Sequence, residues 1–191
     1  MKKIALLFTV FVLNACVSSA QKSVLIAYHS ETGNTERMAQ SVAEGAKSVE
    51  GVQVALKEVG DVKESDLITA DAIILGSPIY NAAVSPQMSA FIASWPFEGG
   101  PLKNKIGAAF VTSGGISAGE ELVQMSLLQS MLVFGMIVVG GPDWTQPFGA
   151  SAVTSEEPFN TQAPEEIHAA FLEKGQKLGE RVAQTVLLFD K

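Results

Sequence analysis

One short loop contains the side chains best suited to bind a small anion. It spans residues 30–35 and reads Ser30, Glu31, Thr32, Gly33, Asn34, Thr35. An apolar run at residues 24–28 precedes it, and a helical pattern begins at its last residue. A phosphate placed there would meet free backbone N–H groups, the positive end of a helix dipole and three hydroxyl donors. The loop therefore predicts a phosphate cradle made of neutral donors; the alternative is a turn that only caps the helix.

Two further turns have the same small and polar character. They span residues 78–83 and 112–117, and each follows another fully apolar run. In a parallel sheet the carboxyl ends of the strands meet at one edge, and ligands bind there, where the strand order switches. We therefore expect the three turns to form one ligand site.

The apolar pattern alternates between strand and helix along the chain. Strand-like runs occupy residues 23–29, 52–56, 72–77, 106–111 and 136–139. Continuous apolar strands separated by helices indicate a parallel sheet covered on both faces. The predicted fold class is therefore α/β with five parallel strands. Residues 140–163 are rich in Gly, Pro, Ser and Thr, and they are predicted to be a long functional or mobile loop.

Local capping signals place several helix starts. Ser85 followed by Pro86 is typical of an N-cap and the first helical position. Ser117 and Glu120 have the spacing of a capping box at the start of another helix. The last helix is predicted to open near Pro164.

Composition and charge exclude several functions. The net charge of -7 and the absence of a basic stripe argue against nucleic-acid binding. Cys16 is the single cysteine, so an internal disulfide and a thiolate metal site are excluded. The chain has only two histidines, and they are far apart in the sequence, so no metal site is expected.

Residues 1–20 have the pattern of a signal peptide. Lys2 and Lys3 precede an apolar run at residues 4–13 that is too short to span a bilayer. The sequence Leu-Asn-Ala-Cys ending at Cys16 resembles a lipobox, which predicts an exported protein anchored to the membrane by a lipid on Cys16. Cleavage after Ala20, which would give a soluble periplasmic form, and a retained anchor are the alternatives. The folded domain is predicted to span residues 23–189.

The pattern Ser-x-Thr-Gly-x-Thr after a first apolar strand resembles the FMN-phosphate loop of the flavodoxin-like superfamily. Residues 72–92, 112–115, 135–139 and 147–151 resemble, in the same order, segments of the NAD(P)H:quinone oxidoreductases of the tryptophan-repressor-binding-protein type. The resemblance covers roughly residues 23–183.

The resemblance implies a flavodoxin-like fold with strand order 2-1-3-4-5 and bound FMN. Residues 30–35 would hold the phosphate. By position, the residues that would border the flavin ring are Pro78, Ile79, Tyr80 and Asn81 on one side and Thr112, Ser113, Gly114, Gly115, Ile116 and Ser117 on the other.

This chain departs from the quinone reductases at several points. Thr32 stands where they have a tyrosine, and Phe134 stands where they have a flavin-contacting histidine. The long insertion associated with their tetramer is missing, so the oligomeric state stays open. The third turn has no aromatic residue to stack on the ring, and an open ring face leaves room for a substrate.

Two redox functions follow from the resemblance. The first is an oxidoreductase that passes electrons from NAD(P)H to a quinone-like acceptor by hydride transfer through FMN, with no catalytic acid or base from the protein. The second is an exported electron carrier that docks on a redox protein. A flavin-free binding module is the remaining alternative.

Two aromatic residues and both histidines have expected places relative to this site. Tyr80 is expected at the site, and Trp144 is expected either to cover the site or to anchor its own loop. His29 is expected to be structural, and His168 is expected to face solvent on the last helix.

Overall fold

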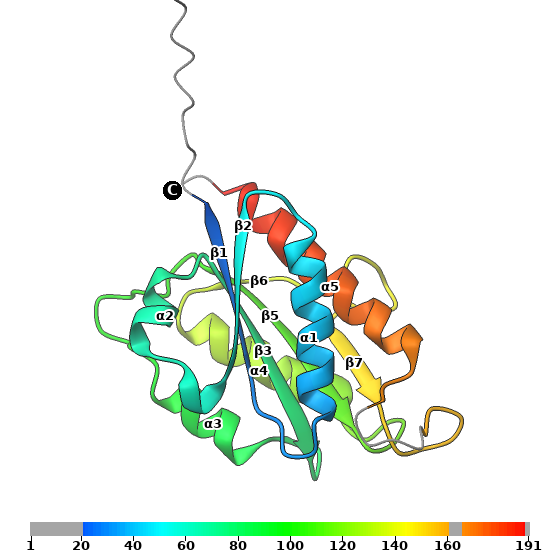
Figure 1. Ribbon diagram of the computed structural model, residues 1–191. Coiled ribbons are helices and arrows are strands. Elements are labelled where there is room, and N and C mark those ends of the chain that lie inside the picture. The colour runs from blue at the N-terminus through cyan, green and yellow to red at the C-terminus, as the bar shows by residue number, and fades with distance from the viewer. Residues whose placement is uncertain (1–20, 161–165, 190–191) are drawn as a thin grey trace, which may run out of the picture.

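The computed structural model describes residues 21–160 and 166–189 as a sheet covered by helices (Figure 1). The strands are β1 (Lys22–Tyr28), β2 (Val52–Glu58), β3 (Ala72–Tyr80), β4 (Ala83–Val84), β5 (Ile106–Ser113), β6 (Ile137–Val138) and β7 (Ala150–Val153). The helices are α1 (Asn34–Lys47), α2 (Glu64–Thr69), α3 (Pro86–Ala93), α4 (Glu120–Val133) and α5 (Ala169–Leu187), with a 3-10 turn η1 (Val59–Asp61). The predicted signal peptide, Cys16 and the helix start near Pro164 lie outside the described residues.

The sheet order is β2-β1-β3-β5, and the last position is shared by β6 and β7. Both short strands run parallel to β5. The strands β2, β1, β3 and β5 also run parallel to one another. The predicted order 2-1-3-4-5 is confirmed, because β4 pairs only with the end of β3 and adds no position to this path.

Helices cover both faces of the sheet, and side chains alternate between the two layers as the two-residue period of a strand requires. Val24 and Ile26 of β1 pack in the layer formed with α1 and α5. Leu25 and Ala27 pack in the layer formed with α2, α3 and α4. The apolar runs are continuous because each strand has a core on both sides.

The structure corrects the prediction for the last part of the sheet. The strand predicted at residues 136–139 is reduced to β6, and β7 lies inside the stretch predicted to be a loop. Ala150 and Ala152 of β7 are fully buried, so this strand is built from small residues. Its sequence, Ala-Ser-Ala-Val, lacks the large branched residues that identify the other buried strands.

The capping signals had mixed outcomes. Ser85 is the N-cap of α3, and its hydroxyl accepts a hydrogen bond from the Met88 N–H, as predicted. The capping box at Ser117 is wrong, because α4 begins after Gly119, which has a φ of +104° and makes no side-chain cap. The Glu120 carboxylate instead accepts a hydrogen bond from Ser113.

Residues 21–160 and 166–189 contain no helix with the length and apolar character that crossing a bilayer requires. None of their His, Asp and Glu side chains gather in a group that could hold a metal ion.

Helices α1 and α5 lie side by side in Figure 1, and glycines bring their backbones into contact. A Cβ added at Gly45 of α1 would lie 1.9 Å from the backbone oxygen of Gln176 in α5. A Cβ added at Gly179 of α5 would lie 1.9 Å from the backbone oxygen of Val42 in α1. Any side chain at either position would therefore force the helices apart.

We expect Gly179→Ala to destabilise the protein by about 1–3 kcal/mol, because the added methyl group overpacks a backbone contact. Gly60→Ala is the matched control, since nothing lies within 4 Å of a Cβ at that position. Urea unfolding followed by circular dichroism measures both. Equal midpoints for the two variants would contradict the close contact.

Candidate functional site

The three predicted turns meet at the carboxyl end of the sheet. The parallel register places Pro78 of β3 beside Thr112 of β5, so the second and third turns are neighbours. The Thr35 hydroxyl lies 2.7 Å from the Thr112 hydroxyl, in a buried pair that joins the first turn to the third. The tip of the β3–β4 hairpin reaches the start of α4, where a Cβ at Gly119 would lie 2.9 Å from that of Ala82.

The first turn exposes the head of α1. Its N-cap is Gly33, in the left-handed conformation with a φ of +86° and without a side-chain cap. Glycine is needed there because a side chain would strain this conformation. The amide N–H groups of the first turn of α1 are thus not capped by a neighbouring side chain, as an anion site at a helix N-terminus requires.

The hydroxyls of the first turn have different surroundings. The Ser30 hydroxyl is buried and has no hydrogen-bond partner among the described residues. The Thr32 hydroxyl accepts a hydrogen bond from the Asn34 side chain at 3.3 Å and keeps its own proton to donate. The Thr35 hydroxyl is shared with Thr112, so it serves the frame of the site as well as any ligand.

The unpartnered Ser30 hydroxyl is the direct test of whether a phosphate fits. A buried hydroxyl without a partner is unfavourable, and an anionic oxygen is the strongest acceptor it can find. The open helix start beside it supplies further donors. These residues fit the phosphate group of a mononucleotide.

The second turn is displaced along the chain relative to the prediction. Pro78, Ile79 and Tyr80 extend β3, and the turn itself is Asn81–Ala82, where both residues have a positive φ. The Tyr80 hydroxyl donates a 2.8 Å hydrogen bond to the Glu31 carboxylate. This bond connects the second turn to the first at the mouth of the site. Burial of the phenol raises the pKa of Tyr80, and the hydrogen bond to Glu31 is the second cause of this increase.

The third turn begins two residues later than expected, since Thr112 and Ser113 still belong to β5. The Ser113 hydroxyl donates to the Glu120 carboxylate at 2.9 Å. Residues 114–117 therefore lie in a loop held at its base by a buried contact. Gly114, Ile116 and Ser117 are exposed, and Gly115 is half-buried.

A fourth segment, which sequence reasoning missed, supports the third turn. It follows β7, where the Thr154 N–H and hydroxyl both donate to the Ser113 backbone oxygen at 3.0 Å. The Glu156 carboxylate accepts the Ile116 N–H at 2.6 Å. Its place directly after a strand would have marked this segment as part of the site. The sequence predicts a loop there instead of β7, so that signal was missed.

Two residues near the site are structural. His29 is buried and shares a 3.1 Å hydrogen bond between its Nδ1 and the Ser85 hydroxyl, which links the end of β1 to the cap of α3. His168 is exposed, as predicted, but it is the N-cap of α5 and not part of the helix. Its Nδ1 accepts the Ala170 N–H at 3.3 Å.

Four other aromatic residues lie away from the three turns. Trp144 is 87% exposed, so it does not anchor its loop. The next residue, Thr145, bonds to Lys174 of α5 through its backbone oxygen, which places this loop at the side of the sheet. Phe134 follows the last residue of α4 and contacts the rings of Trp95 and Phe97 at the opposite end of the molecule.

The doubly wound sheet, its strand order and the three turns at its carboxyl end define a flavodoxin-like α/β domain, whose first turn fits a mononucleotide phosphate. Residues 23–150 match the NADPH-dependent FMN reductase family. The chain belongs to this family. It is an FMN-binding, flavodoxin-like oxidoreductase, and NAD(P)H as electron donor agrees with the family.

Relatives and solved structures agree with this assignment. A flavodoxin from Aquifex aeolicus is 37% identical over 176 residues, which cover 87% of this chain and 88% of that protein. An NAD(P)H dehydrogenase (quinone) from Azorhizobium caulinodans is 30% identical over 196 residues, which cover 85% and 96%. The crystal structure of a WrbA-like flavodoxin from Agrobacterium tumefaciens matches with a TM-score of 0.73 at 25% identity, covering 88% and 99%. The predicted resemblance to the tryptophan-repressor-binding-protein type is confirmed.

We expect Ser30→Ala to weaken FMN binding about tenfold, because it removes one hydrogen bond to a charged phosphate. Ser65→Ala, on the exposed side of α2, is the control and should bind like the unmodified protein. Fluorescence titration with FMN gives both dissociation constants. Unchanged affinity in Ser30→Ala would remove this hydroxyl from the phosphate site.

The phenol of Tyr80 should titrate above its ordinary pKa, because burial and the Glu31 carboxylate both favour its neutral form. Glu31→Gln should lower this pKa toward the ordinary value, since only burial then remains. A raised pKa in the folded state means that this contribution to stability is complete at neutral pH and is lost as the pH rises through that pKa. Phenolate absorbance, corrected with Tyr80→Phe, measures the shift; equal titrations of the two proteins would disprove the contact.

Proposed function

We propose that this chain takes electrons from NAD(P)H and passes them in pairs to a quinone or a chemically similar acceptor. The observation that carries the proposal is the buried, unpartnered Ser30 hydroxyl beside the uncapped start of α1. When bound, FMN supplies a ring that exchanges a hydride. The protein supplies position, electrostatics and access.

The residues of the first turn would bind the FMN phosphate and so fix the register of the cofactor. Ser30 and Thr32 each have a hydroxyl proton available for it. The Thr35–Thr112 pair would keep this turn at a constant distance from the third turn. The net effect is a cofactor held at its phosphate end by groups that carry no charge of their own.

The second and third turns would border the ring. Pro78 and Ile79 form a half-buried wall at the end of β3, and residues 114–117 form the opposite wall. The third turn has no aromatic side chain, and Ile116 there is 49% exposed. An acceptor could therefore approach the ring from this side, which favours turnover of a small substrate.

The purified protein, loaded with FMN, tests this proposal. NADH or NADPH oxidation should depend on an added benzoquinone, and Ile116→Trp should slow it by covering the open side. Leu122→Trp, on the exposed surface of α4, is the control and should turn over normally. FMN-loaded protein that oxidises neither nicotinamide with any quinone would disprove the proposal.

An electron carrier that docks on a redox protein is the second candidate. Acidic side chains around the three turns favour it, because a basic partner would be attracted to them. Glu31 lies at the mouth of the site, Glu156 at the third turn and Glu120 behind it. A relative that is named a flavodoxin agrees with this candidate. Fast electron exchange with a basic redox protein, without quinone turnover, would select it.

A further inference from the structure

The end of the molecule opposite the site is unusually apolar. Among the described residues, twelve large hydrophobic side chains are more than a third exposed, and eight of them lie at this end. We call this surface the basal face and define it by Ile68, Phe97, Val133, Ile137, Leu188 and Phe189. Val133 is 69% exposed and Leu188 is 81% exposed, so their side chains contribute little to the core. Contiguous apolar surface of this kind marks an interaction site.

The topology explains why these residues gather. Helices that connect parallel strands run back toward the start of the next strand, so they all end at the amino end of the sheet. Val133 ends α4, Ile68 lies in the last turn of α2, and Leu188 follows α5. Ile137 begins β6 and pairs with Ile106, the first residue of β5.

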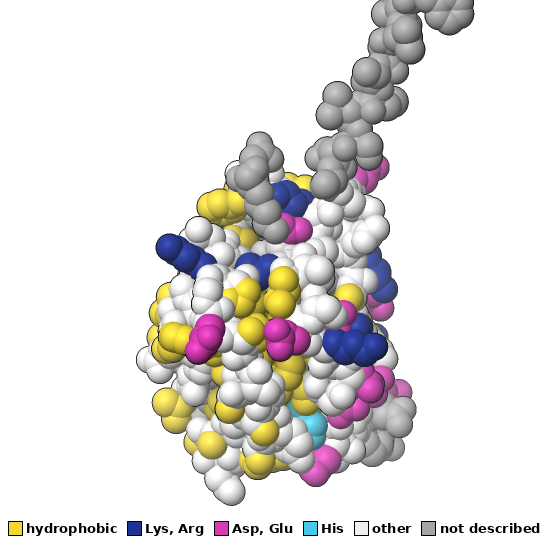
Figure 2. Space-filling view, turned by 90° about the vertical axis from the view of Figure 1, so that its left-hand side faces the viewer, with side chains coloured by type: hydrophobic (Ala, Val, Ile, Leu, Met, Phe, Trp, Pro, Cys, Tyr) yellow, Lys and Arg dark blue, Asp and Glu magenta, His cyan; other side chains and the backbone are white. Residues whose placement is uncertain are grey.

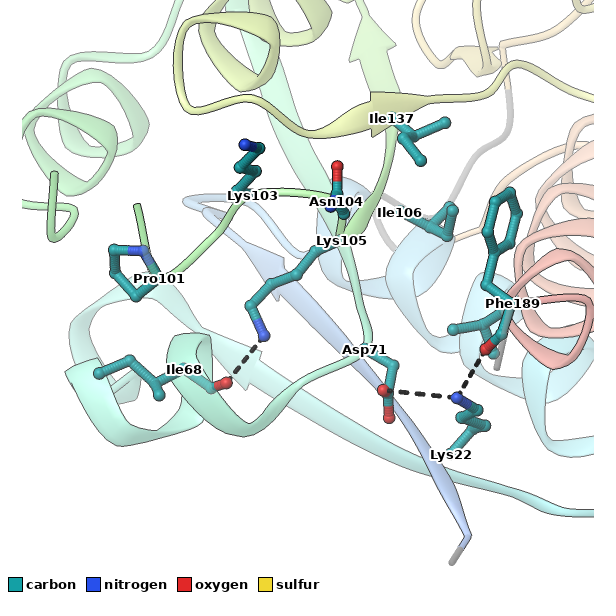
Figure 3. Close-up of a pocket in the computed structure, with 11 residues that line it drawn as sticks. Lys22, Ile68, Asp71, Pro101, Lys103, Asn104, Lys105, Ile106, Ile137 and Phe189 are labelled. Carbon is teal, nitrogen blue, oxygen red and sulfur yellow. Dashed lines mark hydrogen bonds and ion pairs between the residues drawn. The ribbon is translucent and has the colours of Figure 1, made fainter. Parts of the chain in front are cut away.

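Two adjoining hollows make the basal face continuous. The first, of about 600 Å³, lies between α2, the start of β5 and the end of α5 (Figure 3). The second, of about 260 Å³, is lined by Phe97, Val133 and Phe134. Lys103 lines both hollows. Its ammonium group forms no ion pair within the described part of the chain and points away from the other labelled side chains in Figure 3.

Polar contacts fix the floor of the larger hollow. The Lys22 ammonium donates to the Phe189 backbone oxygen at 2.7 Å and lies 4.0 Å from the Asp71 carboxylate. The Lys105 ammonium is buried and donates to the Ile68 backbone oxygen at 2.7 Å. These bonds join β1, α2 and α5 into one frame from which the apolar side chains project (Figure 3).

Lysines accompany the apolar side chains around the larger hollow. Lys22, Lys103 and Lys105 line it, together with one acidic residue, Asp71. Its lining is therefore more basic than acidic, although the chain as a whole has 13 basic and 20 acidic residues. Figure 2 shows yellow, dark blue and magenta side chains intermixed in the upper half of the view, toward the end where β1 begins.

The chain enters the fold at this same end. Lys22 starts β1 and lines the larger hollow. The predicted lipidation site, Cys16, precedes it by six positions, a distance of roughly 20 Å when fully extended. A lipid on Cys16 would therefore hold the basal face close to the bilayer.

We propose that the basal face rests on the surface of an anionic phospholipid bilayer. Apolar side chains of the face enter the headgroup boundary, and Lys103 binds lipid phosphates. The proposal rests on the predicted anchor and not on the proposed function. It places the redox site on the side of the protein that faces away from the membrane.

Hydrogen exchange of the full chain tests this orientation. The protein is compared in detergent and in vesicles of equal parts phosphatidylcholine and phosphatidylglycerol. We expect at least fivefold slower exchange in vesicles at residues 97–100, 132–137 and 187–189, and no change at residues 31–35, 80–82 and 114–117. Slower exchange at the redox turns, or none at the basal face, would overturn the proposal.

Matched variants separate the face from the anchor. In a Cys16→Ser background, which cannot be lipidated, the double variant Val133→Ser/Leu188→Ser should reduce co-sedimentation with these vesicles about tenfold, because two apolar contacts are lost. Leu122→Ser is the control, since this residue is 63% exposed at the other end of α4. Equal sedimentation of both variants would contradict the proposal. FMN binding and quinone turnover, measured in detergent, test the proposed function separately.

Discussion

Parallel strand pairing is the constraint on which the rest of the molecule depends. Each strand must begin where the preceding helix ends, so strand ends and helix starts gather at one end of the sheet. Small polar turns, uncapped amides and the Glu31–Tyr80 contact all occupy that end. Helix ends and most of the exposed large apolar side chains among the described residues occupy the other. One topological rule thereby creates two chemically different poles.

Much of this fold could be predicted from local patterns. The second, third and fourth positions of the parallel sheet, which are β1, β3 and β5, are apolar runs with cores on both faces, and such runs are visible in the sequence. The fifth position was not, because β7 uses buried alanines and its partner strand β6 has only two residues. The burial of β7 depends on its contacts with α5 and β5, which are distant in sequence and so cannot be predicted from a local pattern.

The site was also predicted only in part, because local segments are visible in the sequence and contacts between distant segments are not. Residues 30–35 were recognisable because a phosphate loop is a contiguous segment. The hydrogen bonds that join one turn to another were not, since Thr35 and Thr112 are 77 positions apart. Glu156, which accepts the Ile116 N–H, belongs to a segment placed by an unrecognised strand. Ser117 was misread because a capping box resembles any Ser-x-x-Glu spacing, whereas a left-handed Gly119 starts the helix.

The backbone contact between α1 and α5 has a consequence for ligand uptake. Because Gly45 and Gly179 let the two helices touch along their length, α1 has little freedom to rotate or slide. The amides at its start are therefore held in position before any phosphate arrives. A site that is already ordered loses little conformational entropy when it is filled. A protein that folds before it meets its nucleotide gains from this rigidity, since capture then requires no rearrangement of the loop.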